Sequence, residues 1–193
     1  MHTRLSGVRS TGETMIAVFI SGYGSNLQAL LDYNLPIAFV ASNNPNAYGL
    51  ERAKKTGVPT YVEPTAVLRN FEKMAHEKCV EHDVKLIVLA GFMRILTPRF
   101  VNKWENRIVN IHPSLLPAFK GKNAIQEAFD YGVKVTGVTI HYVDQGMDTG
   151  EIINQEPVYV QETLKQTEEM IHVMEHAMFA PTVKEIYDQI TNG

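Results

Sequence analysis

A short stretch at residues 108–121, IVNIHPSLLPAFKG, places an amide and an imidazole in an apolar run. Asn110 and His112 are spaced by two residues, so in a β-strand their side chains lie on one face. Such a pair on a buried strand needs hydrogen-bond partners or a chemical role. An amide donor beside a histidine at the carboxyl end of a strand favours a chemical role, although a lone buried histidine is more often structural. Pro113 and Pro117 then restrict the chain where it leaves the strand, which favours a fixed site.

A second polar segment, YVDQGMDTGE at residues 142–151, contains two carboxylates, Asp144 and Asp148. Its two glycines allow a tight turn. A carboxylate close to His112 would favour the imidazolium, whereas a single acid in a loop is more commonly a solvated turn residue. His141, just before this segment, could face the same cleft or the core.

The segment SGYGSN at residues 21–26 follows an apolar run and precedes a helical pattern. Backbone amides at such a turn can hold a phosphate, and glycines allow a close approach. The segment is not a Walker loop, because no Gly-Lys-Ser/Thr follows. It also fails the dinucleotide fingerprint, because Leu27 stands where the third glycine belongs. The alternative is a plain glycine turn with Ser25 as the helix N-cap.

A third segment, AGFMRI at residues 90–95, follows another apolar run. Met93, Ile95 and Leu96 could be core residues, which is the commoner role for such side chains. The alternative is an apolar slot for a flat aromatic ligand, with Arg94 at its rim.

Two histidine-rich segments resemble metal sites, but each lacks a ligand. HVMEH at residues 172–176 matches the inverted zinc-protease pattern, yet few residues remain downstream to supply a third ligand. HEKCVEH at residues 76–82 spaces two histidines and a cysteine by three residues and offers no fourth ligand. We therefore expect no metal.

The composition indicates one globular domain. The chain has 193 residues, of which 45% are hydrophobic and 20% charged. A net charge of −3 gives no electrostatic case for nucleic acid, and small-molecule substrates are expected instead. Cys79 is the single cysteine, which excludes an internal disulfide and favours a reducing compartment. Whether the protein is a monomer or a homodimer stays open.

The chain carries no sequence signal for a membrane or for secretion. No apolar stretch approaches the roughly 20 residues needed to span a bilayer. Residues 1–14 lack the apolar region of a signal peptide, so we interpret them as a flexible leader or a remnant of expression. The folded domain is expected at residues 15–193, in a cytoplasmic protein.

Hydrophobic patterning predicts an alternation of strands and helices in the first two thirds of the chain. Strands are expected at residues 15–20, 36–42, 59–62, 85–91 and 108–112, and helices at 26–33, 47–56, 66–82 and 97–104. The last of these helices has Thr97 as N-cap and Pro98 in its first turn. Such alternation is typical of a parallel, doubly wound sheet.

The pattern changes after residue 130. Two strands at residues 133–143 and 151–160 are separated by a short loop, which predicts an antiparallel pair. A long helix is expected at residues 164–190, with a possible kink at Pro181. The predicted fold class is a single α/β domain with a mostly parallel, Rossmann-like sheet, an antiparallel C-terminal addition and a long C-terminal helix. Ligands of such sheets bind outside the carboxyl ends of the parallel strands.

Several of these motifs together resemble the glycinamide ribonucleotide formyltransferases, folate-dependent enzymes of purine biosynthesis. The resemblance runs from residue 15 to the C-terminus, and its motifs occur in the same order. It is carried by the segments SGYGSNLQAL, AGFMRIL, NIHPSLLPAFKG, VTGVTIHYVDQGMDTG and MEHAMF. It implies transfer of the formyl group of 10-formyltetrahydrofolate, a co-substrate, to the amine of glycinamide ribonucleotide.

The resemblance also implies roles for individual residues. The catalytic trio would be Asn110, His112 and Asp148, with His141 as a second-rank candidate. The implied ligand contacts are Gly24, Ser25 and Asn26 for the substrate phosphate, Glu175 for its ribose, and Met93, Arg94, Ile95, Leu96, Val143 and Asp144 for the folate. The Leu116–Pro117 bond would be cis.

The sequence departs from this family at two positions. Family members often have proline where Glu151 stands, and a basic or amide residue near His172, which is therefore a second-rank phosphate contact. Two rival functions remain. One is a hydrolase that releases formate from the same folate, and the other is a non-catalytic folate or nucleotide binder. The intact trio argues against the binder, and the phosphate loop argues against the hydrolase.

Overall fold

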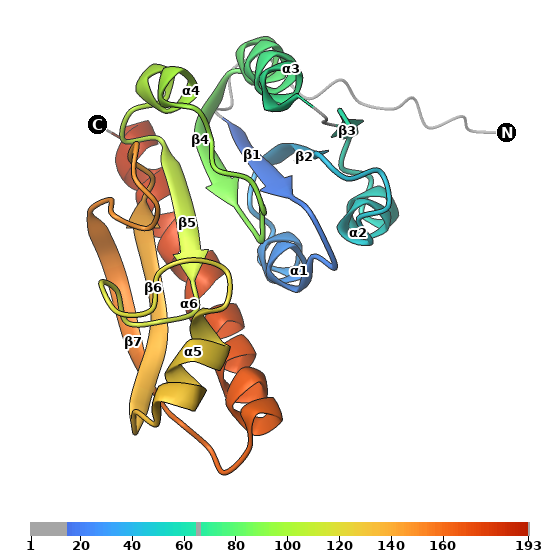
Figure 1. Cartoon of the computed structure of the whole chain (residues 1–193). Coiled ribbons are helices and arrows are strands. Elements are labelled where there is room, and N and C mark those ends of the chain that lie inside the picture. Colours follow the sequence, from blue (N-terminus) through green and yellow to red (C-terminus); the bar gives the residue numbers. More distant parts are fainter. Residues whose placement is uncertain (1–14, 65–66, 193) are drawn as a thin grey trace, which may run out of the picture.

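The computed structural model describes residues 15–64 and 67–192, and the expected leader at residues 1–14 lies outside them. Within these residues the chain forms a seven-stranded sheet with the order β3-β2-β1-β4-β5-β6-β7 (Figure 1). The strands from β3 to β5 are parallel, and β6 and β7 are antiparallel additions at one edge. This confirms the predicted fold class.

The elements follow the predicted alternation closely. The strands are β1 (Met15–Ile20), β2 (Ile37–Ser42), β3 (Thr60–Val62), β4 (Val84–Leu89), β5 (Ile108–His112), β6 (Val135–Tyr142) and β7 (Ile152–Tyr159). The helices are α1 (Ser25–Asp32), α2 (Gly49–Lys55), α3 (Leu68–Glu81), α4 (Pro98–Lys103), α5 (Ala124–Tyr131) and α6 (Leu164–Asn192). Buried, β-branched runs such as those of β1 and β4 suit strands that are covered on both faces.

Helices cover both faces of the sheet. On one face, β1 contributes Ile16, Val18 and Ile20 to a core that also contains residues of α1, α2 and α6. On the other face, Ala17 and Phe19 of the same strand pack in a core with residues of α3 and α4. The alternation along β1 therefore separates two apolar cores, and the sheet is the middle of three layers.

The structure adds one helix that the sequence analysis did not predict. Helix α5 follows the proline segment and ends at Gly132, whose φ of 83° provides the left-handed C-cap. Helix α6 continues through Pro181 without a break. Thr97 is the N-cap of α4, as predicted, and its side chain accepts a hydrogen bond from Phe100 N. Among the described residues, no helix has both the length and the apolar content to cross a membrane.

Candidate active site at the carboxyl edge of the sheet

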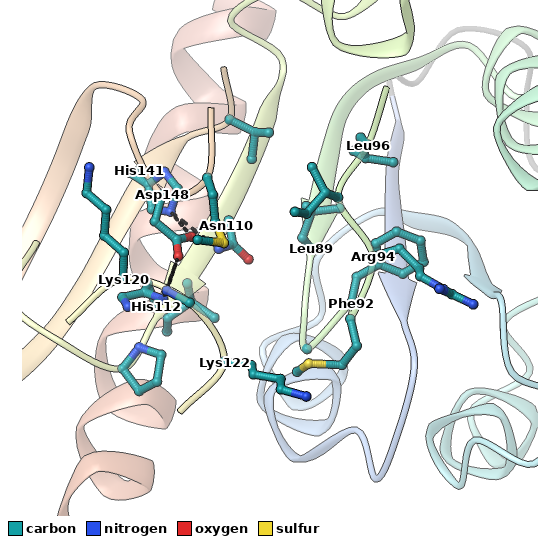
Figure 2. Close-up of a pocket in the computed structure, with 18 of the residues that line it drawn as sticks. Leu89, Phe92, Arg94, Leu96, Asn110, His112, Lys120, Lys122, His141 and Asp148 are labelled. Atoms are coloured by element: carbon teal, nitrogen blue, oxygen red, sulfur yellow. Dashed lines mark hydrogen bonds and ion pairs between the residues drawn. The ribbon is translucent and has the colours of Figure 1, made fainter. Parts of the chain in front are cut away.

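The chain order of the strands reverses between β1 and β4, and the loops that follow these strands flank the point of reversal. Ligands of open α/β sheets bind at such points. A cavity of about 570 Å³ lies beside this point, at the carboxyl ends of β4 and β5. Figure 2 shows its two walls: Asn110, His112, His141 and Asp148 lie on one side, and Leu89, Phe92, Arg94 and Leu96 on the other. The two predicted groups of residues therefore face one cavity.

His112, the last residue of β5, is 4% exposed and has a defined ring orientation. Its Nε2 donates a hydrogen bond to the carbonyl oxygen of Phe119, at 2.8 Å. The other ring nitrogen, Nδ1, lies 3.5 Å from Oδ2 of Asp148. Because the carbonyl fixes the proton on Nε2, Nδ1 is the nitrogen that remains for chemistry beside the carboxylate.

Asn110 is held by His141, its direct neighbour on the antiparallel strand β6. The Nδ1–H of His141 donates to the carbonyl of Tyr142 at 2.8 Å, so a neutral ring presents Nε2 as an acceptor. The Asn110 Nδ2 lies 3.3 Å from this Nε2. The contact orients the amide, with one N–H on His141 and the second left for another acceptor. His141 thus belongs to the cluster, not to the core alone.

Asp148 completes the cluster from the loop between β6 and β7. Its Oδ2 accepts a hydrogen bond from Gly121 N at 2.8 Å, and its Oδ1 lies 3.7 Å from Nε2 of His141. The pKa of Asp148 is lowered to about 2, first by its side-chain contact with His141, although burial acts against this. The Gly121 N–H and the neighbouring His112 lower it further. The carboxyl group is therefore ionised at neutral pH.

The segment after β5 is fixed by more than its prolines. The Thr139 hydroxyl donates to Ser114 O at 2.7 Å and accepts from Leu116 N at 3.1 Å. The Gln155 amide donates to Leu116 O at 2.9 Å. The Leu116–Pro117 bond is cis, as the resemblance implies. These buried contacts hold the chain that carries Phe119 and Gly121, the backbone partners of the catalytic candidates.

The residues that are expected to bind the folate all line the same cavity, but some are exposed and others are buried. Met93 and Ile95 are 66% and 65% exposed and line the cavity, so they present apolar surface to it. Leu96 is buried and packs in the core of α3 and α4, so the alternative core reading holds for this residue. Val143 and Asp144 line the other side, and the Asp144 Oδ1 accepts hydrogen bonds from Gly146 N and the Thr149 hydroxyl.

The predicted phosphate loop joins β1 to α1. Gly24 is the N-cap, with a φ of 78° and no side-chain cap, and Ser25 is the first helical residue. The expectation that Ser25 is the N-cap is therefore wrong. The first N–H groups of a helix lack intrahelical partners, so those at the start of α1 are available to an anion. Asn26 follows, and its Oδ1 is buried and has no hydrogen-bond partner in the structure.

The predicted phosphate loop lies beside the cavity. Ser21 N donates to Gly91 O at 3.1 Å, and the Ser21 hydroxyl accepts from Met93 N at 2.8 Å. These bonds tie the start of the loop to the segment that carries the folate candidates. Gly24, Ser25 and Asn26 do not line the cavity itself, which leaves them free to bind a different part of a substrate.

Glu175 and His172 lie on α6, which packs against α1. The His172 Nδ1 donates to Oε2 of Glu175 at 2.9 Å, and this contact raises the pKa of His172, although partial burial acts against it. Glu175 is buried, whereas His172 is exposed. Within the described part of the chain, no three His, Cys, Asp or Glu side chains are grouped so that they could hold a metal ion.

Several residues of the site were not identified from the sequence. They act through backbone atoms or line the cavity: Phe119, Lys120, Gly121, Lys122 and Asn123. A phenylalanine gives no sequence signal for a positive φ, yet Phe119 has one of 50°. Lys120 and Lys122 are the residues of this set that the sequence could have indicated, because two cations beside an apolar slot suit a ligand with carboxylates.

Comparison with known proteins shows the family to which the fold and the site belong. The chain belongs to the formyl transferase family, whose model matches residues 14–183. Phosphoribosylglycinamide formyltransferase of Bacillus subtilis (strain 168) is 40% identical over 181 residues, which cover 88% of this chain and 93% of the relative. The crystal structure of phosphoribosylglycinamide formyltransferase from Streptococcus pneumoniae has a TM-score of 0.86 and 40% identity, and the match covers 91% of this chain and 99% of that one.

Other relatives are much longer. The trifunctional purine biosynthetic protein adenosine-3 of Chironomus tentans is 42% identical over 194 residues, which cover 94% of this chain but 14% of the relative. The chain therefore spans about one seventh of the length of that protein.

Proposed function

We propose that this protein transfers the formyl group of 10-formyltetrahydrofolate to the amine of glycinamide ribonucleotide. One observation carries the proposal. Asn110, His112 and Asp148 meet on one wall of a cavity, opposite exposed apolar side chains that suit a pterin ring. The relatives' names and the phosphate loop beside this cavity support the same reaction. The domain that carries it is proposed to run from residue 15 to residue 193.

The reaction needs donors for an oxyanion. The amine attacks the formyl carbon, and the carbonyl oxygen becomes negatively charged in a tetrahedral intermediate. The second N–H of the Asn110 amide and a protonated Nδ1 of His112 are suited to stabilise this charge. Both groups are already oriented, Asn110 by His141 and His112 by Phe119, so little reorganisation is required when the charge develops.

The reaction also moves one proton. The attacking amine loses a proton, and N10 of the departing tetrahydrofolate gains one, so the exchange is balanced. With a pKa of about 2, Asp148 is a weak base and is unsuited to keep this proton at neutral pH. Its separation of 3.5 Å from the His112 Nδ1 exceeds a direct hydrogen bond. We infer that Asp148 stabilises the imidazolium and orients a water molecule that relays the proton.

The two substrates would use different parts of the site. The pterin is proposed to bind between Met93–Leu96 and the loop that includes Val143 and Asp144, with Arg94 positioning the folate. The phosphate of the acceptor would bind the amides of residues 24–26, and Glu175 would contact its ribose. The Ser21 bridge to Met93 supports this arrangement, because it links the loop at residues 21–26 to the segment at residues 93–96.

A crystal structure with glycinamide ribonucleotide and a folate that has no formyl group tests this assignment. We expect the phosphate at the N-terminus of α1 and the pterin between residues 93–96 and 143–148. In this arrangement the acceptor amine should point toward Asn110 and His112. A phosphate bound elsewhere, or a folate outside the 570 Å³ cavity, would contradict the proposal.

A further inference from the structure

Helix α2 forms a wall behind the proposed phosphate loop. Gly49, its first residue, donates its N–H to the Gly22 carbonyl at 3.1 Å. The contact is close, because a Cβ on Gly24 would lie 2.7 Å from the Gly49 Cα. A Cβ on Gly49 would in turn lie 2.5 Å from the Ile20 side chain. The loop and the start of α2 therefore pack backbone against backbone.

Arg52, one turn further along α2, extends this wall with its side chain. Its Nε donates to the Tyr23 carbonyl at 3.0 Å, and its Nη1 donates to the Gln28 Oε1 at 3.1 Å. Tyr23 lies in the loop, and Gln28 lies in α1. One guanidinium group thus ties both sides of the loop to α2.

Two tyrosine rings hold the guanidinium in place. Its carbon lies 4.5 Å from the ring centroid of Tyr23 and 5.0 Å from that of Tyr48. The two rings stack on each other with centroids 5.2 Å apart and an interplanar angle of 15°. Cation–π contacts of this kind favour arginine and restrict its rotamers. Tyr23 is 68% exposed, so the cluster is built on the surface and adds little to the core.

The hydrogen bonds from α2 also determine where the loop amides point. In a trans peptide, the C=O of one residue and the N–H of the next point in opposite directions. The carbonyls of Gly22 and Tyr23 are turned toward Gly49 and Arg52. The N–H groups of Tyr23 and Gly24 therefore point away from α2. They are available for an anion together with the first N–H groups of α1.

We propose that Arg52 is a positioning residue for the acceptor phosphate. It acts through the Tyr23 carbonyl and the Gln28 side chain: it fixes the peptide planes of the loop and leaves the phosphate to the backbone amides. This inference rests on the proposed function, because it assumes that the loop binds the phosphate of the acceptor. The ligand that the loop would bind is a phosphate monoester.

The test compares two acceptors, glycinamide ribonucleotide and its dephosphorylated riboside, in wild type and variants. Arg52→Gln removes the charge and the two hydrogen bonds. Arg52→Lys keeps the charge but lacks the planar fork that reaches both partners. Lys54→Gln is the control, since it removes one charge from the same helix at a side chain that pairs with Glu51 and is 58% exposed.

We expect both Arg52 variants to lower the ratio of kcat/KM between ribonucleotide and riboside by about 10-fold or more. The KM for ribonucleotide should rise, while kcat and the KM for 10-formyltetrahydrofolate stay near wild type. Lys54→Gln should keep the wild-type ratio. Tyr48→Ala, which removes one of the rings beside the guanidinium, should lower the ratio by a smaller factor. A general loss of folding would lower both rates together and leave the ratio unchanged.

Three outcomes would overturn the inference. If wild type discriminates and both Arg52 variants discriminate equally well, Arg52 does not position the loop. If Arg52→Lys keeps the full ratio and Arg52→Gln loses it, long-range charge and not positioning is responsible. If wild type itself does not prefer the ribonucleotide, the phosphate loop of the proposed function fails, and the role of Arg52 fails with it.

Discussion

At the scale of single residues, the site depends on which atoms already have partners. His112 gives one ring nitrogen to a backbone carbonyl and directs the other toward Asp148. Asn110 gives one amide hydrogen to His141. In each of these two side chains, one polar group thus has a hydrogen-bond partner within the protein, and the other is available to a substrate. This division explains how the buried His112 and the half-buried Asn110 can be stable and still reactive.

Replacing Asp148 with asparagine removes the charge of the side chain and keeps its shape. We expect Asp148→Asn to lower kcat by about 10²-fold or more, because the amide neither stabilises the imidazolium nor orients the water in the same way. Stopped assays of tetrahydrofolate formation, with melting temperature as the control for folding, measure this. A variant that keeps most of the wild-type kcat would remove Asp148 from the trio.

The side chains of the trio could be predicted from the sequence, but their backbone partners could not. Asn110 and His112 are identified by a spacing of two in a strand, whereas the glycine-containing loop offers both Asp144 and Asp148, and the family resemblance selects Asp148. Phe119 and Gly121 contribute a carbonyl and an N–H, groups that every residue carries. Their role follows from the path of the chain after the prolines, which is set by Thr139 and Gln155.

At the scale of elements, the loop between β1 and α1 is the most demanding part of the site. Gly24 combines a left-handed backbone with a close approach to α2, whereas a Cβ added to Gly22 would meet no atom within 4 Å beyond its chain neighbours. The sequence motif predicts a glycine turn, but it does not say which glycine is essential. The contact with Gly49, a residue 25 positions downstream of Gly24, provides the distinction.

Matched substitutions at the two glycines test this difference. Gly24→Ala should lower stability by about 1–3 kcal/mol and raise the KM for the ribonucleotide, because both its φ of 78° and the contact with Gly49 oppose a Cβ. Gly22→Ala should be close to wild type in both respects. Thermal unfolding and steady-state kinetics measure the two quantities. Equal behaviour of the two variants would show that the loop does not need this backbone.

Helix α6 provides a pH-dependent contact. The pKa of His172 is raised above 6.5, mainly by its hydrogen bond to Glu175. A raised pKa in the folded state means that the contact stabilises the protein fully below pH 6.5. This contribution is lost as the pH rises through the higher pKa of the folded state.

The melting temperatures of wild type and His172→Gln should therefore differ most in mild acid, at about pH 5.5, and converge in mild base. His176→Gln controls for the loss of another exposed histidine from α6. A difference between wild type and His172→Gln that is the same at every pH would contradict the assigned contact.

Most elements could be predicted because apolar runs and helical spacing are local properties. Helix α5 was missed, although Ala124 and Ala128 are buried at helical spacing and Gly132 supplies a C-cap. Its eight residues follow a loop stabilised by Thr139 and Gln155, and no local signal marks where that loop ends.

At the scale of the whole molecule, the site joins segments that are distant in the sequence. The loops after β1 and β4, the end of β5 and the loop before β7 meet at one edge of the sheet (Figure 1). The alternation of strands and helices predicts such an edge, and the family resemblance assigns its residues. Neither predicts that Ser21 bridges the phosphate loop to Met93, because that contact depends on the order β1-β4 within the sheet.

The most direct test of the central claim follows tetrahydrofolate formation from 10-formyltetrahydrofolate under three conditions: with glycinamide ribonucleotide, with its riboside, and with no acceptor. Several hydrogen bonds to a phosphate dianion are charge-assisted, so their loss should lower kcat/KM for the riboside by about 10²–10³-fold. Without an acceptor, tetrahydrofolate should form negligibly. Fast formation with the ribonucleotide alone is the result that we predict. Equal rates under all three conditions would contradict formyl transfer and indicate a hydrolase.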